Sequence, residues 1–198
     1  MVHLGFRLLV RPGIRLRVPA RRLAIRVGGG HLDHRGGAQM VARSLDVEVR
    51  RFARRDLQRV LAIERASFGK DAWPPALFLE YWRASPELFL IAKHRRRIAG
   101  YSITRTDWRG AELESIAVHP RLRGRGVAQA LLEATLLSLR SAGVRALRLM
   151  AGTSNEPALR FYRRLGFIRV RKVKRYYGPA RDAWRMRLEL RPKKQAHE

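Results

Sequence analysis

A glycine-rich turn between a strand pattern and a helix pattern is the feature that most constrains this chain. Residues 113–118 read Leu-Glu-Ser-Ile-Ala-Val, and Pro120 ends the pattern because proline has no backbone donor for a sheet. The turn Arg123-Gly124-Arg125-Gly126 follows, and apolar residues from Val127 to Leu137 then recur with helical spacing. Glycine lets the backbone approach a ligand closely, and the first amide groups of a helix attract anions. The sequence therefore predicts a strand, turn and helix that suit a pyrophosphate.

The turn matches neither of the two common nucleotide-binding motifs. A dinucleotide-binding loop needs a third glycine at a fixed place, and a P-loop needs a lysine; both are missing here. The ligand of this turn must be identified from its surroundings.

Strand and helix patterns alternate on both sides of the turn. Strands are expected at 47–52, 88–92, 98–103, 111–118, 144–150, 167–170 and 183–190. Helices are expected to begin near Asp56, to cover 76–83, to run from 127 to a stop at Gly143, and to run between the N-cap Asn155 and Gly166. This alternation predicts a single α/β domain with a mixed (α+β) sheet.

The two ends of the chain differ from its middle. Residues 1–39 hold eight arginines and one acidic residue, which predicts either a disordered basic extension or a misassigned start, with translation beginning at Met40. The folded domain is expected at 40–190, followed by a polar tail at 191–198. The sequence holds no apolar run of membrane-spanning length, so we expect a cytoplasmic protein without a membrane span.

Charge and cysteine content limit the chemistry. The net charge of +27 favours contact with nucleic acid or the ribosome, although an arginine-rich solvated surface is the alternative. The chain has no cysteine, which excludes disulfides and thiolate catalysis, and no residue cluster has the spacing of a metal site.

Two separate motifs resemble the GNAT superfamily of acetyltransferases. The cofactor loop of that superfamily reads Arg or Gln, two variable residues, Gly, one variable residue, then Gly or Ala, and Arg123, Gly126 and Ala128 match it. Residues 154–167 are similar to the segment in which these enzymes place an asparagine and a tyrosine near the thioester. The resemblance covers about residues 47–190. It implies a mostly antiparallel sheet with a splayed parallel pair flanked by helices, and acetyl-CoA as co-substrate.

Within the superfamily the chain is most similar to protein N-terminal acetyltransferases, particularly bacterial ribosomal-protein alanine acetyltransferases. Residues 63–68 with Trp73-Pro74, the pair Tyr176-Tyr177, and residues 182–186 carry this resemblance. It implies that a protein N-terminal amine is the acceptor. A small amine or a lysine is the alternative acceptor, and a non-catalytic ribosome- or RNA-binding module is the alternative function. One departure is Met150, which stands where those enzymes often carry a glutamate on the fifth strand.

The resemblance also implies roles for particular residues. The cofactor-binding residues are Ile116, Ala117, Val118, Arg123, Gly124, Arg125, Gly126, Val127, Ala128 and Asn155. Tyr162 is the candidate general acid, with a place in a core stripe as the alternative. Glu114, on the strand that enters the site, is the best candidate for a general base; Glu112, which shares its face by the period of two, and a water relay are the alternatives. Glu64 is expected at the peptide entrance. Tyr176 and Tyr177 either close over the substrate N-terminus or are exposed loop residues.

Overall fold

A computed structural model describes residues 25–27 and 47–190 of the chain. The strands are β1 (Ile25–Val27), β2 (Val47–Arg51), β3 (Phe89–His94), β4 (Arg97–Asp107), β5 (Gly110–Val118), β6 (Ala146–Gly152), β7 (Ile168–Val173) and β8 (Ala183–Glu189). The helices are α1 (Leu57–Phe68), α2 (Pro75–Ala84), α3 (Val127–Ser141) and α4 (Glu156–Arg164), with short 3₁₀ turns at Arg54–Asp56, Gly69–Asp71 and Pro120–Leu122. The strands form one sheet in the order β1-β2-β3-β4-β5-β6-β8-β7. Among the strands of the described residues, β5 and β6 alone pair in parallel, which confirms the predicted fold class.

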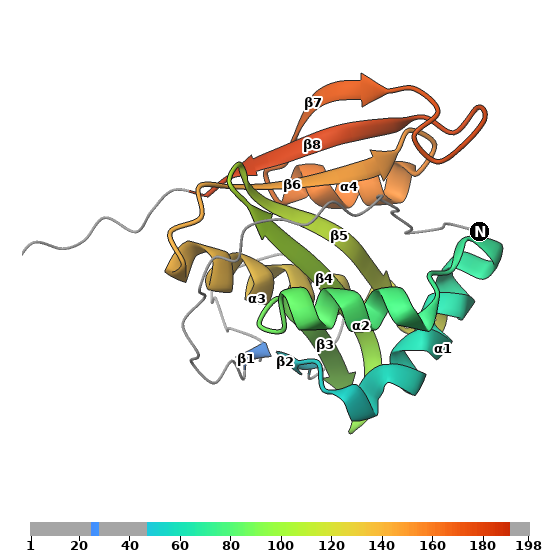
Figure 1. The fold of residues 1–198 in the computed structure, drawn as a ribbon, viewed down its shortest axis with the longest axis vertical. Coiled ribbons are helices and arrows are strands. Elements are labelled where there is room, and N and C mark those ends of the chain that lie inside the picture. The colour runs from blue at the N-terminus through green and yellow to red at the C-terminus, as the bar shows by residue number, and fades with distance from the viewer. Residues whose placement is uncertain (1–24, 28–46, 191–198) are drawn as a thin grey trace, which may run out of the picture.

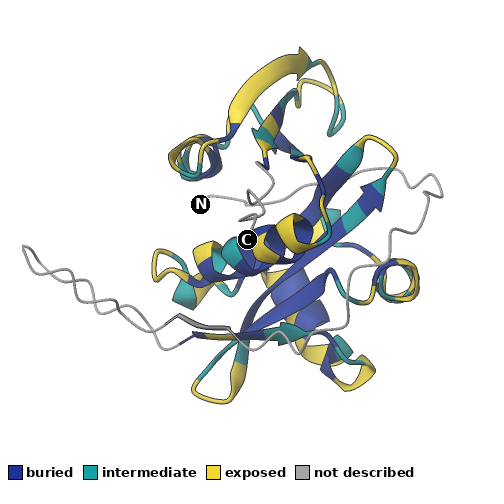
Figure 2. Cartoon of the chain, turned by 90° about the vertical axis from the view of Figure 1, so that its left-hand side faces the viewer, coloured by how far each residue is buried: buried dark blue, intermediate teal, exposed yellow. Residues whose placement is uncertain are grey.

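Helices cover both faces of this sheet (Figure 1). Helices α1 and α2 pack on one face of β3 to β5, and their apolar residues form a core with aromatic rings of β3 and β4. Helices α3 and α4 contribute to a second core on the other face. The central strands are buried from both sides, as Figure 2 shows in dark blue. On the α1 and α2 side, the half of the sheet formed by β6, β8 and β7 is covered by no helix of the described residues.

The parallel pair separates soon after it begins. The register of β5 with β6 runs only from Ala111 opposite Leu147 to Leu113 opposite Leu149, although both strands continue. Figure 1 shows β5 and β6 adjacent at one end and apart at the other. From Glu114 onward, the edge of β5 that faces β6 therefore has no partner strand.

A β-bulge marks the place where the two strands part. The pairing of β4 with β5 changes from Ile103 opposite Ser115 to Thr104 opposite Leu113, which leaves Glu114 as the extra residue. Leu113 and Ile116 consequently lie in the same core, whereas strict alternation would put them on opposite faces. The bulge determines on which face of the sheet each β5 side chain lies.

Several boundaries differ from those the sequence predicted. Strand β4 continues to Asp107 and β7 to Val173, because their polar second halves pair with β5 and β8. Most of the basic segment 1–39, and the tail 191–198, lie outside the described residues. The exception is β1, which pairs with β2 at the edge of the sheet. No helix in the described part of the chain is long and apolar enough to cross a membrane.

Candidate active site

The glycine turn has a backbone that only glycine adopts without strain. Gly124 has φ of 71° and Gly126 has φ of 82°, both in the left-handed region. A Cβ atom at either position would meet nothing within 4 Å, so the backbone conformation, not crowding, requires glycine. Helix α3 begins at Val127, and its first backbone N–H groups have no acceptor inside the helix. Such N–H groups at a helix start, next to an exposed turn, favour an anion.

The arginines of the turn divide into two kinds. Nε of Arg123 donates to the carbonyl oxygen of Val118 at 3.3 Å, and burial lowers the pKa of this guanidinium. Arg123 therefore holds the turn against β5. Arg121 and Arg125 are exposed, so their guanidinium groups are available to neutralise phosphates.

The open edge of β5 lies next to the turn. Ile116, Ala117 and Val118 pair with β4 on one side, and their side chains are buried in the two cores. Gly100 of β4 allows this close packing, because a Cβ atom there would lie 2.7 Å from the oxygen of Ala117. On the side toward β6, the backbone groups of this stretch have no partner strand, although the Val118 carbonyl oxygen accepts from Arg123.

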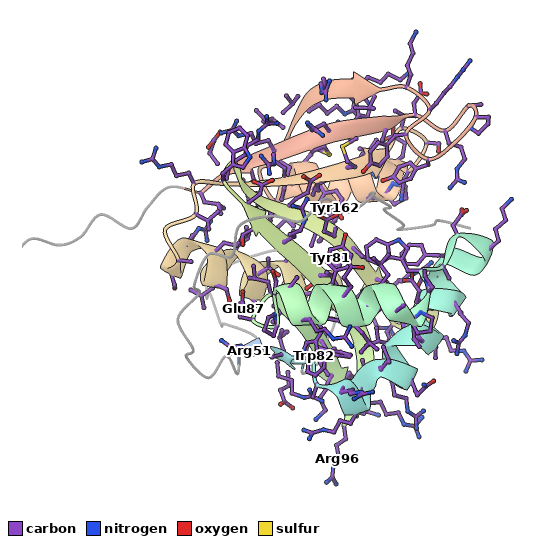
Figure 3. The ribbon with its side chains drawn as sticks, viewed as in Figure 1. Arg51, Tyr81, Trp82, Glu87, Arg96 and Tyr162 are labelled. Atoms are coloured by element: carbon purple, nitrogen blue, oxygen red, sulfur yellow. The ribbon has the colours of Figure 1, made fainter. Side chains whose placement is uncertain are left out.

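Helix α4 brings a tyrosine to the gap between the strands. Asn155 caps the helix by accepting from the N–H of Ala158 at 3.2 Å, as predicted. Tyr162 is wholly buried, and its ring packs against Phe161 and Phe167. Burial raises the pKa of Tyr162, so the phenol keeps its proton. Figure 3 shows Tyr162 where β5 and β6 diverge, so it is both part of the core and next to the open edge.

Glu114 is a buried carboxylate with one occupied oxygen. Nε of Arg105 donates to Oε1 at 2.8 Å, whereas Oε2 is buried on the side of the carboxylate that Arg105 does not bind, and the Tyr81 hydroxyl also interacts with the carboxylate. Burial raises the pKa of Glu114 to about 7, although Arg105 opposes the rise. The charge of Glu112, on the same strand, also raises the pKa of Glu114. Nε of Arg148 lies 3.9 Å from Oε2 of Glu112. Glu114 can therefore exchange a proton near neutral pH.

The two adjacent tyrosines of the loop between β7 and β8 lie at the same gap. The Tyr177 hydroxyl donates to the carbonyl oxygen of Met150 at 3.2 Å, which places its phenol beside β6 where the strands have parted. The ring of Tyr176 contacts that of Tyr177 edge-on, with centroids 4.7 Å apart. Burial raises the pKa of both phenols, and the charge of Glu112 raises them further. The two tyrosines are half-buried and are not freely exposed loop residues.

Glu64 is not placed with these residues. It is 1% exposed, and Oε1 accepts from the N–H of Trp73 at 2.8 Å. The Tyr101 hydroxyl donates to Oε2, and burial raises the pKa of Glu64 to about 7. The expectation that Glu64 lines an open entrance is therefore replaced by a role inside the protein, where it joins the loop after α1 to β4. Among the residues that the structure describes, no group of three His, Asp or Glu side chains is placed to hold a metal ion.

Two residues of the site were absent from the sequence prediction. Arg105 binds Glu114 from β4, and the Tyr81 hydroxyl of α2 interacts electrostatically with the same carboxylate. Figure 3 shows Tyr81 on α2, below Tyr162. No sequence motif marks either residue, because their contact with Glu114 depends on the bulge in β5 and on the packing of α2.

An open strand edge next to a helix start with unpaired backbone N–H groups is compatible with an acyltransferase that uses a coenzyme A thioester. Residues 56–167 match the model of the acetyltransferase (GNAT) family. The chain belongs to this family, and it is an N-acetyltransferase with acetyl-CoA as its acetyl donor.

Relatives and solved structures agree with this assignment. N-alpha-acetyltransferase RimI of Mycobacterium tuberculosis is 34% identical over 156 residues, which cover 76% of this chain and 97% of that protein. Ard1 of Thermoplasma volcanium has a similar structure, with a TM-score of 0.70, 28% identity, and coverage of 73% of this chain and 98% of that one. The ribosomal-protein-S18-alanine N-acetyltransferase of Escherichia coli has a TM-score of 0.67 and 25% identity, with coverage of 77% and 99%.

Proposed function

We propose that this enzyme acetylates the α-amine at the N-terminus of a protein or peptide. The observation that carries the proposal is the pKa of about 7 for Glu114 at the open edge of β5. An α-ammonium group has a pKa near 8, so its proton moves to such a carboxylate at a cost of about 1 kcal/mol. A lysine ammonium near 10.4 would cost about 5 kcal/mol. The names of the relatives, N-alpha-acetyltransferase and ribosomal-protein-S18-alanine N-acetyltransferase, support the same acceptor.

Each side chain at the gap then has a role in transfer. Acetyl-CoA supplies the electrophilic carbonyl carbon when it is bound. Oε2 of Glu114 accepts the proton of the incoming amine, because Arg105 binds the other oxygen of this carboxylate. The hydroxyl of Tyr162 donates a proton to the departing sulfur. Tyr176 and Tyr177 close over the acceptor N-terminus.

The binding of the donor follows from the turn and the open edge. The N–H groups at the start of α3, with Arg121 and Arg125, hold the pyrophosphate. The backbone of residues 116–118 pairs with the pantetheine arm, and the amide of Asn155 donates to the same arm while its oxygen caps α4.

The proposal also covers the class of acceptor protein, the cellular compartment and the bounds of the catalytic domain. A ribosomal protein is the acceptor class that agrees with a net charge of +27, because such a charge favours contact with ribosomal RNA. The proposed compartment is the cytoplasm, because it supplies both acetyl-CoA and nascent proteins. The catalytic domain comprises residues 40–190.

The test is release of coenzyme A thiol from acetyl-CoA in the presence of defined acceptors. Peptides that begin with Ala, Ser, Met or Gly are compared with their N-acetylated forms, a peptide with a single lysine, and spermidine. Turnover of the free peptides alone is the expected result. Turnover restricted to the lysine peptide or spermidine would overturn the proposed acceptor.

A further inference from the structure

The uncovered face of β6, β8 and β7 carries arginines that stand directly opposite one another. Arg148 of β6 lies opposite Arg187 of β8, and Arg185 of β8 lies opposite Arg171 of β7. Directly opposed residues of an antiparallel pair share a face of the sheet, with Cβ atoms about 5 Å apart. Like charges on directly opposed residues are destabilising, so each pair favours an anion beside it.

One of the two pairs already has anions. Nη2 of Arg148 makes bonds of 2.9 Å to both carboxylate oxygens of Asp107, and Nε of Arg187 lies 2.7 Å from Oε1 of Glu189. The charges of this pair are therefore compensated within the protein.

The pair formed by Arg171 and Arg185 has no such acidic partner among the described residues. Arg171 and Arg185 form no ion pair with any acidic side chain that the structure describes. Nε of Arg185 is buried and has no hydrogen-bond partner. Arg171 is exposed, so the pair can be reached from solvent. A buried guanidinium donor without an acceptor is costly, and an external carboxylate would remove that cost.

The pair adjoins the acceptor side of the gap. Arg185 lies opposite Met150, whose carbonyl oxygen accepts from Tyr177, and Arg185 interacts electrostatically with the Tyr176 hydroxyl. Met150 stands just beyond Leu149, the last β6 residue that pairs with β5. Neighbouring strands lie about 4.8 Å apart, and an extended peptide advances about 3.4 Å per residue. A peptide whose amine lies at Glu114 can therefore reach this pair within its first few residues.

We propose that Arg171 and Arg185 form a carboxylate-binding site that selects acceptors with an aspartate or glutamate within their first four residues. The proposal rests on the acceptor argued above. Glu114 does not oppose an acidic acceptor, because Arg105 compensates its charge. A guanidinium pair can bind both oxygens of a carboxylate, which gives orientation as well as affinity.

The test compares peptides that begin with Ala and differ only by Glu or Gln at position 2, 3 or 4. Wild type is expected to favour one Glu peptide by about tenfold in kcat/KM. Arg185→Gln and Arg171→Gln should each reduce this preference to nearly one, with little change for the Gln peptides. Arg187→Gln is the matched control, because it removes an arginine from the same face that already has an acidic partner, and it should retain the preference.

The outcomes separate this inference from the proposed function. Equal use of Glu and Gln peptides by wild type would overturn the carboxylate site and leave N-terminal acetylation standing. No turnover of any peptide with a free N-terminus would overturn both. If the Glu preference stayed unchanged in Arg185→Gln and Arg171→Gln while binding of a single-stranded RNA oligonucleotide fell, the pair would serve phosphate and not the acceptor.

Discussion

Nε of Arg105 lies 2.8 Å from Oε1 of Glu114, and this ion pair joins β4 to β5 at the bulge where β5 leaves β6. The pair fixes the orientation of the carboxylate, so Oε2 is the oxygen left for a substrate amine. It also limits how far burial can raise the pKa of Glu114. The bulge, the ion pair and the proposed proton acceptor are therefore one structural unit.

Glu114→Gln tests the proposed base. We expect kcat to fall by about 10²-fold, because an amide cannot accept the amine proton. The wild-type carboxylate, with a pKa of about 7, is protonated at lower pH, so activity should rise through pH 7. The variant should lose this rise in activity near pH 7 and keep only the rise caused by deprotonation of the substrate amine, whose pKa is near 8. Rates of thiol release between pH 5.5 and 9 measure both effects.

The matched control for that prediction is Glu112→Gln. Glu112 lies on the same strand and its charge raises the pKa of Glu114, so this variant should keep the rise in activity but shift it to lower pH. A wild-type pH profile retained in Glu114→Gln would remove Glu114 from the role of base.

Tyr162→Phe tests the proposed acid. The substitution keeps the buried ring and its contacts with Phe161 and Phe167, so the fold should remain intact. We expect kcat to fall by about 10²-fold or more, with little change in the KM for acetyl-CoA. Circular dichroism and thermal unfolding provide the structural control. Full activity in a folded variant would leave Tyr162 with only its packing role.

Much of the fold followed from local sequence patterns. The strand, glycine turn and helix at 113–141 were predictable because proline, glycine and helical spacing act over a few residues. Asn155 was predictable as an N-cap for the same reason, and the structure confirms it.

The arrangement of charges at the site was not predictable in this way. The bulge at Glu114 depends on the pairing of β5 with β4, which lies outside any local pattern. The burial of Glu64 depends on a donor from Tyr101, which is 37 residues away in the sequence. The open arginine pair depends on the order of β6, β8 and β7 in the sheet. Such features come from contacts distant in sequence, and a single sequence does not reveal them.

Gly126→Ala tests the anion-binding turn. Alanine in the left-handed region costs about 1–2 kcal/mol, so the turn should change conformation and displace the N–H groups of α3. We expect the KM for acetyl-CoA to rise severalfold, together with a modest loss of stability. Gly143→Ala is a close control, because Gly143 has φ of 71° and open space around it at the other end of α3. A similar rise in KM for both variants would contradict a local role for the turn.

Glu64→Gln tests the effect of the buried carboxylate on stability. The pKa of Glu64 is about 7 in the folded protein and near 4.5 when exposed, so the folded state binds more protons between these values. The free energy of unfolding should therefore fall as pH rises from 4.5 to 7, by up to about 3 kcal/mol from this residue. Glutamine can still accept from the N–H of Trp73 and can donate to the Tyr101 oxygen. The variant should keep the fold and show a flatter pH dependence in urea unfolding.

Glu114 titrates in the same range, so Glu64→Gln together with Glu114→Gln should flatten the pH dependence of unfolding further. A wild-type slope in Glu64→Gln would show that this carboxylate does not carry the raised pKa.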